Sequence, residues 1–204
     1  MSDNPYQKNI QFYSTLLAEH GLHARSLNWG SEESQAKRFK VLSQVAELNN
    51  QNILDVGCGL GDYYQWLKAQ KKDVHYHGID ITPGMIETAT SRFPGVKFDV
   101  GTIDTINETG EVDYSFASGI FYLVENEPFS FMKATISKMF TVSRKAIAFN
   151  TLSDWATVKT NDEFYASPTE TLEFCHSLSP YVTIRHDYHP ADFTIYIYKD
   201  NPTL

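Results

Sequence analysis

The sequence has 204 residues, of which 42% are hydrophobic and 21% charged, values typical of a globular protein long enough to bury a sizeable core. Its net charge of −8, with lysines and arginines scattered along the chain, argues against duplex nucleic acid or an anionic membrane as the main partner, because either would favour a basic patch. No uninterrupted apolar run approaches the roughly 18 residues of a transmembrane helix, so we expect no membrane-spanning segment.

Residues 1–50 are polar and aromatic, and parts of them have helical spacing. Two groups of apolar residues could each line one helix face: Phe12 with Leu16 and Leu17, and then Phe39, Leu42, Val45 and Leu48. The first residues lack the apolar core of a signal peptide, and the two cysteines have neither metal-ligand spacing nor a disulfide framework. We therefore expect a cytoplasmic protein with free thiols and no metal site.

From residue 52 onward, strand-like and helix-like segments alternate. Strands are predicted over 52–56, 74–80, 96–100, 112–118 and 145–151. Helices are predicted over 61–70, 83–92 and 128–142. Alternation of this kind favours a parallel sheet with helices on both of its faces.

The C-terminal part has a different pattern. Ser167 and Glu170 form a capping-box signature, which predicts a short helix ending near residue 177. Two strand-like runs follow, over 181–187 and 192–199. The connection between them is too short for a parallel crossover, so we expect an antiparallel hairpin.

The glycines that follow the first strand are the strongest functional signal. Gly57, Gly59 and Gly61 end an apolar strand-like run, and Asp80 follows about twenty positions later, at the end of the next run. Glycines let a ligand approach the backbone closely, and an acidic residue at that spacing is the usual partner of ribose hydroxyls. The pattern predicts a site for an adenosine-containing cofactor.

Two aspartates argue against a nicotinamide or flavin dinucleotide. The dinucleotide fingerprint has glycine or alanine three residues after its second glycine, where this chain has Asp62. Asp55, inside the strand, is also atypical of dinucleotide binders and could meet a cationic amine. Asp55 could also be a buried carboxylate that loop N–H groups satisfy.

The chain resembles the class I S-adenosylmethionine (SAM)-dependent methyltransferases. Residues 54–61, 78–86, 96–101 and 112–119 look like the first four motifs of that family. The resemblance implies an α/β, doubly wound, Rossmann-like fold with a mostly parallel seven-stranded sheet. Its expected strand order is 3-2-1-4-5-7-6, with strand 7 antiparallel.

We expect one methyltransferase domain over residues 1–204. Residues 1–50 would form an N-terminal helical cap or lid, and residues 51–152 the cofactor-binding core. Residues 153–204 would supply an acceptor-side loop, a helix and the terminal hairpin.

SAM is the cofactor that the resemblance implies. Ten residues would surround it: Asp55, Gly57, Gly59, Gly61, Asp80, Ile81, Thr102, Ile103, Ser118 and Gly119. In the family's pattern the glycines approach the methionine part and the first aspartate lies near its amino group. The second aspartate accepts bonds from both ribose hydroxyls, the next isoleucine packs on adenine, and the residues at 102 and 103 recognise the adenine edge. The serine and glycine after the fourth strand line the methyl-transfer face.

Two regions could bind the methyl acceptor. Trp29 could cover the cleft and Arg38 could hold a carboxylate, or else Trp29 packs in the core and Arg38 is a solvated helix charge. Tyr122, Trp155 and Tyr165 could form an aromatic pocket for a planar or cationic acceptor, or they could close the core.

The expected reaction is methyl transfer from SAM to an oxygen or nitrogen of a small molecule. The acidic composition and the lack of an Asn-Pro-Pro-Tyr-type motif after the fourth strand favour a small acceptor. A methyltransferase acting on protein or RNA, a non-catalytic SAM-binding module and a dehydrogenase remain as alternatives. The sequence identifies no catalytic base and leaves the oligomeric state open.

Overall fold

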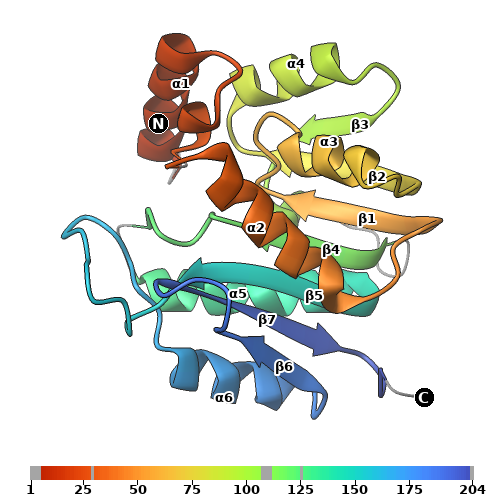
Figure 1. The fold of residues 1–204 in the computed structure, drawn as a ribbon, viewed down its shortest axis with the longest axis vertical. Helices are drawn as coiled ribbons and strands as arrows, with labels where there is room; N and C mark the ends of the chain where they lie inside the picture. The colour runs from red at the N-terminus through yellow and green to blue at the C-terminus, as the bar shows by residue number, and fades with distance from the viewer. Residues whose placement is uncertain (1–5, 29, 107–111, 125, 203–204) are drawn as a thin grey trace.

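The computed structural model describes residues 6–28, 30–106, 112–124 and 126–202 (Figure 1). Its strands are β1 (Gln51–Val56), β2 (Val74–Asp80), β3 (Lys97–Val100), β4 (Val112–Ser118), β5 (Ser143–Leu152), β6 (Val182–Arg185) and β7 (Asp192–Tyr198). Its α-helices are α1 (Gln7–His20), α2 (Glu32–Leu42), α3 (Asp62–Ala69), α4 (Pro83–Arg92), α5 (Pro128–Val142) and α6 (Pro168–Leu178). Short 3₁₀ helices are η1 (Ala24–Leu27), η2 (Ser43–Val45) and η3 (Ile103–Thr105).

All seven strands belong to one sheet, in the order β3-β2-β1-β4-β5-β7-β6. The pairs from β3 to β5 are parallel, whereas β7 pairs antiparallel with both β5 and β6. The predicted fold class and strand order are therefore confirmed. Within the described residues, no helix combines the length and apolar composition that crossing a bilayer requires.

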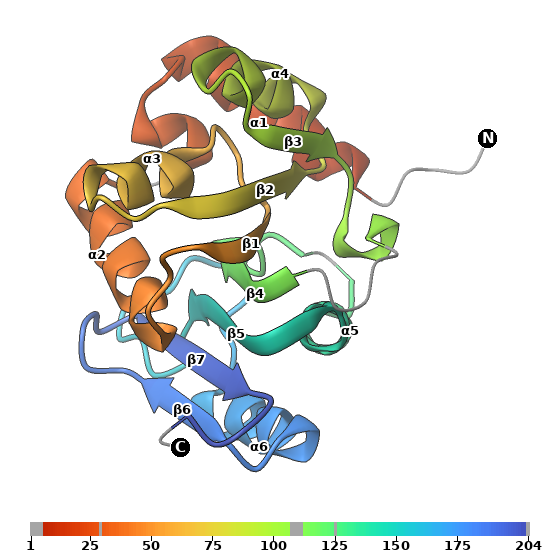
Figure 2. The same cartoon turned by 90° about the vertical axis from the view of Figure 1, so that its right-hand side faces the viewer.

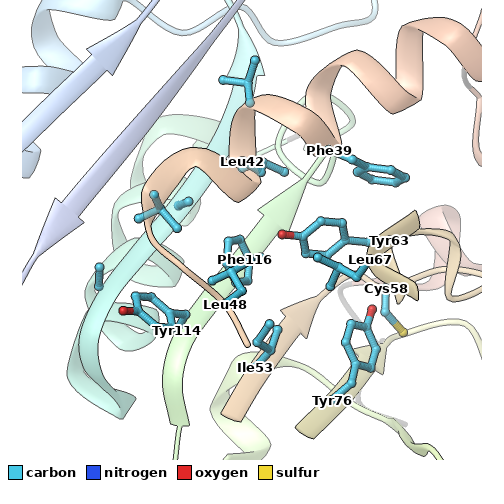
Figure 3. Close-up of a cluster of buried hydrophobic side chains, with 14 of the residues drawn as sticks. Phe39, Leu42, Leu48, Ile53, Cys58, Tyr63, Leu67, Tyr76, Tyr114 and Phe116 are labelled. Carbon is cyan, nitrogen blue, oxygen red and sulfur yellow. The ribbon is translucent and has the colours of Figure 1, made fainter. Parts of the chain in front are cut away.

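Helices cover both faces of the sheet (Figures 1 and 2). On one face, Phe39 of α2 and Tyr63 and Leu67 of α3 pack over Ile53 and Phe116 of the central strands (Figure 3). On the other face, α5 buries a stripe that consists of Met132, Ile136, Met139 and Val142. Because both faces are covered, the central strands are buried along most of their length.

The predicted helix through Phe39 and Leu48 ends earlier than its spacing suggested. α2 stops at Leu42, η2 adds one tighter turn, and Leu48 is buried in the connection to β1. A repeat of three residues matches the 3.0 residues per turn of a 3₁₀ helix, whereas an α-helical face would drift away from it. The spacing therefore predicted the buried apolar positions correctly, but it did not predict the change from an α-helix to a 3₁₀ helix.

A buried ion pair joins the N-terminal region to the last strand. The Arg38 guanidinium of α2 donates to Asp192 of β7 and to the Ser34 carbonyl, and both charged side chains are buried. His189 Nδ1 lies 2.9 Å from the same Asp192 carboxylate. Arg38 is therefore not a solvated helix charge, and the carboxylate that it binds in this structure is that of Asp192.

Arg38→Met should lower the free energy of unfolding by about 3–5 kcal/mol, because it leaves the Asp192 carboxylate buried without its guanidinium. Denaturant unfolding of the purified variant measures this loss. The matched control is Lys40→Met, which removes a charge from an exposed position of the same helix and should change stability by less than about 0.5 kcal/mol. Equal losses in the two variants would contradict a structural role of the pair.

A second buried carboxylate lies between neighbouring strands. Asp55 of β1 is 3% exposed, and the Tyr76 hydroxyl of β2 donates to it. Burial raises the pKa of Asp55 from 3.8 to about 7, although the bond from Tyr76 opposes that shift. Between these two values the folded protein holds a proton that the unfolded chain has released, so this group makes stability fall as pH rises through that interval.

Asp55→Asn should therefore gain stability relative to the unmodified protein as pH rises. Asparagine keeps an oxygen for the Tyr76 hydroxyl and does not ionise. From about pH 5 to about pH 8 the difference in unfolding free energy should shift in favour of the variant by more than about 1 kcal/mol. Thermal or denaturant unfolding across that range checks this, and a difference that is constant with pH would refute it.

Candidate active site

The glycine loop after β1 is bonded to the end of β2. The N–H groups of Gly57 and Cys58 donate to the Ile79 carbonyl at 2.8 and 3.0 Å. The Gly59 N–H donates to Asp80 Oδ2 at 3.0 Å. These bonds hold the loop in one conformation at the carboxyl ends of two adjacent strands.

The loop needs glycine at two positions because other side chains lie directly against it. Gly57 and Gly59 have φ angles of +75° and +52°, which side-chain-bearing residues rarely adopt. A Cβ on Gly57 would come 2.2 Å from Cγ2 of Ile120, and one on Gly59 would come 2.6 Å from Cδ2 of Leu27. The N-terminal region and the segment after β4 therefore both close on this loop.

Asp80 uses both carboxylate oxygens to connect two loops. Besides the bond from Gly59, its Oδ1 accepts the Thr82 N–H at 2.8 Å, at the start of α4. Burial raises the pKa of Asp80 above its ordinary value, while the bonds from Thr82 and Gly59 act against that rise. Each oxygen has a further lone pair that can accept a hydrogen bond from a ligand.

A cavity of about 340 Å³ opens at the carboxyl ends of β1, β2 and β4. Eight of the ten predicted cofactor residues line it: Gly57, Gly59, Asp80, Ile81, Thr102, Ile103, Ser118 and Gly119. The structure does not bring the other two to it. Asp55 lies in the core beside Tyr76, and a Cβ on Gly61 would face Phe93 and Phe98 rather than the cavity.

Several residues that the sequence did not single out also line this cavity. Tyr6, Asn9 and Tyr13 come from the N-terminal region, where no motif marks them. Asp104 lies two positions after Thr102, which stands where the family often has an acidic residue. Looking for an acidic side chain slightly further along the turn would have found Asp104.

A smaller cavity of about 150 Å³ adjoins the first, and Leu27 and Gly119 line both. A pair of hydroxyls lies between them: Tyr13 of the larger cavity and Tyr122 of the smaller one have their oxygens 2.8 Å apart. The Asn28 amide donates to the Tyr122 hydroxyl at 3.0 Å. The two cavities therefore share a short boundary made of side chains from the N-terminal region and from the loop after β4.

The ends of β4 and β5 are joined at this boundary by Asn150. Its Oδ1 accepts the Gly119 N–H at 3.1 Å, and its Nδ2 donates to the Ser118 hydroxyl at 3.0 Å. Sequence reasoning missed Asn150, because nothing local indicates that its amide reaches the neighbouring strand. Its bonds fix the segment where the two cavities meet.

The structure separates the predicted acceptor residues. Arg38 and Tyr122 line the smaller cavity, whereas Tyr165 does not line it and donates to Glu163 at 2.6 Å. Trp155 is 60% exposed, has its ring centroid 5.1 Å from that of His186 in a tilted arrangement, and lines neither cavity. Trp29 lies outside the described residues. Within the described part of the chain, no group of three or more His, Cys, Asp or Glu side chains could hold a metal ion.

Known proteins agree with this architecture. A family described as "Methyltransferase domain" matches residues 47–192. A protein of Mycobacterium tuberculosis (strain H37Rv), named a putative methyltransferase, is 33% identical over 155 residues, which cover 72% of this chain and 93% of the relative.

Solved structures share the fold across nearly the whole chain. The complex of DhpI with SAH has a TM-score of 0.70 and 14% identity, covering 99% of this chain and 100% of that one. Magnesium protoporphyrin IX methyltransferase (ChlM) from Synechocystis PCC 6803, with bound SAM, has a TM-score of 0.68 and 12% identity, covering 97% and 98%. The family match, the similar relative and the motif geometry together establish that this chain belongs to the class I SAM-dependent methyltransferases.

Proposed function

We propose that this enzyme transfers the methyl group of SAM to an oxygen or nitrogen atom of a small molecule. One observation carries the proposal: residues of four separate motifs line one cavity, and a smaller cavity adjoins it at the end of β4. The larger cavity, at about 340 Å³, is within the roughly 300–1,000 Å³ usual for small ligands.

The residues that line the larger cavity fit the cofactor by their chemistry. Asp80 would accept hydrogen bonds from the ribose hydroxyls, and Ile81 would pack on the adenine ring. Thr102 and Ile103 would recognise the adenine edge, with Asp104 as an additional acceptor for its amino group. Gly57 and Gly59 would lie beside the methionine part, and Ser118 and Gly119 beside the methyl group.

Methyl transfer needs little covalent help from the protein. When bound, SAM supplies an electrophilic methyl carbon on a sulfonium. The chain's own task is to orient the acceptor, exclude water and accept hydrogen bonds. Burial raises the pKa values of Tyr13 and Tyr122 above the ordinary phenol value, so both stay protonated near neutral pH. We therefore assign them a positioning role and not that of a base.

The small cavity supports an acceptor of low molecular mass. It is bounded by α2, by the ends of β4 and β5, and by Asp192 at the start of β7. Its volume of about 150 Å³ suits a compact molecule, and its lining combines polar and apolar surface.

Asp80→Ala should weaken SAM binding at least about tenfold, because it removes charge-assisted hydrogen bonds of about 1.5–3 kcal/mol each to the ribose. It also frees the Gly59 and Thr82 N–H groups that hold the two loops. Isothermal titration calorimetry measures the change, and circular dichroism verifies folding. Asp99→Ala, an exposed aspartate on β3, is the charge-matched control and should bind SAM normally. A folded Asp80→Ala protein with unchanged affinity would overturn the site assignment.

A cell extract is divided by ultrafiltration, and each fraction is incubated with the enzyme and methyl-tritiated SAM. We expect the tritium label to appear in products of the low-molecular-mass fraction. A Tyr122→Phe variant should reduce that transfer by about threefold to thirtyfold while SAM affinity stays the same, since it loses one or two hydrogen bonds at the boundary. Transfer confined to protein or RNA would instead support a macromolecular acceptor.

A further inference from the structure

The smaller cavity contains one negative charge that no cation among the described residues balances. Of the charged residues that line it, Arg38 and Asp192 pair with each other. Glu163 has no ion-pair partner among the described residues, and its Oε2 accepts only the neutral Tyr165 hydroxyl, at 2.6 Å. Lys159, in the same loop, lies over the Tyr165 ring at 5.7 Å. The cavity therefore carries a net charge of about −1, which favours a cation.

The surroundings also suit a compact cation. Phe121 and Tyr122 line the cavity, and aromatic faces attract positive charge. The backbone of Tyr122 accepts the Phe164 N–H at 2.8 Å, which fixes the loop that carries Glu163 against the segment after β4. Gly119 also lines the larger cavity, so an acceptor in the smaller cavity could receive the methyl group at this end.

We propose that this cavity binds the methyl acceptor and that the acceptor is a compact polar molecule with a cationic nitrogen, anchored by Glu163. This inference rests on the proposed function. A protonated ammonium has no lone pair, so the anchored nitrogen is not the nucleophile. A second oxygen or nitrogen, directed toward Gly119, forms the new bond to carbon as the carbon–sulfur bond breaks. The electron pair of the broken bond stays on sulfur, and the acceptor's displaced proton leaves to water.

The test uses three molecules of similar size that differ in the charge of one end: ethanolamine, ethylene glycol and glycolate. Ethylenediamine adds a nitrogen nucleophile to the set. Binding of each to the SAH-saturated protein is measured by ligand-observed NMR titration. The two amines should bind at least about tenfold more tightly than ethylene glycol, and glycolate should bind most weakly.

Two variants assign the effect to Glu163. Glu163→Gln should abolish the preference for ethanolamine over ethylene glycol, whereas Glu173→Gln, an exposed glutamate on α6, should preserve it. Both variants should bind SAM as the unmodified protein does, which calorimetry verifies.

The outcomes separate this inference from the proposed function. Normal SAM binding with no preference for amines, a preference for glycolate, or no saturable binding of either amine would overturn the cationic acceptor alone. Retention of the preference in Glu163→Gln would likewise overturn the assigned anchor. Failure of the unmodified protein to bind SAM would overturn the proposed function itself.

Discussion

The order in which the chain adds strands on either side of β1 determines where every candidate functional residue lies. From β1 the chain builds outward to β2 and β3, then returns to place β4 on the opposite side of β1. The loop after β1 leads toward one edge of the sheet and the loop after β4 leads toward the other edge. Because the two loops diverge at the carboxyl ends of these strands, they leave a crevice between them. The glycine loop, Asp80 and Gly119 all lie at this crevice, although they come from three separate segments of the chain.

Local hydrogen bonds then give that space a fixed shape. The Asp80 carboxylate orders the loops after β1 and β2, and the Asn150 amide orders the ends of β4 and β5. Both side chains accept hydrogen bonds from backbone N–H groups that have no partner within a helix or the sheet. A ligand entering the cleft would meet acceptors and donors already held in place, so little conformational freedom would be lost on binding.

The sequence predicted the sheet and most of the larger cavity because their signals are local. Glycine spacing, strand periodicity and the aspartate at the end of β2 each fall within a few residues. The smaller cavity depends on contacts that no local pattern contains. Arg38 meets Asp192 across 154 positions, and Tyr13 meets Tyr122 across 109. Asp55 is the opposite case, because a local motif predicted that it would lie at the cofactor. In the structure Asp55 is buried beside Tyr76 and does not line the cavity.

The boundary formed by Tyr13 and Tyr122 has an evolutionary consequence. Many residues that line the larger cavity belong to motifs at the ends of the strands, although Tyr6, Asn9 and Tyr13 come from the N-terminal region. Residues that line the smaller cavity come largely from the N-terminal region and the last third of the chain. Substitutions in the second group can reshape one compartment while leaving the other intact. Descendants of a common ancestor can in this way keep a single donor and acquire new acceptors, with selection acting on two nearly independent sets of positions.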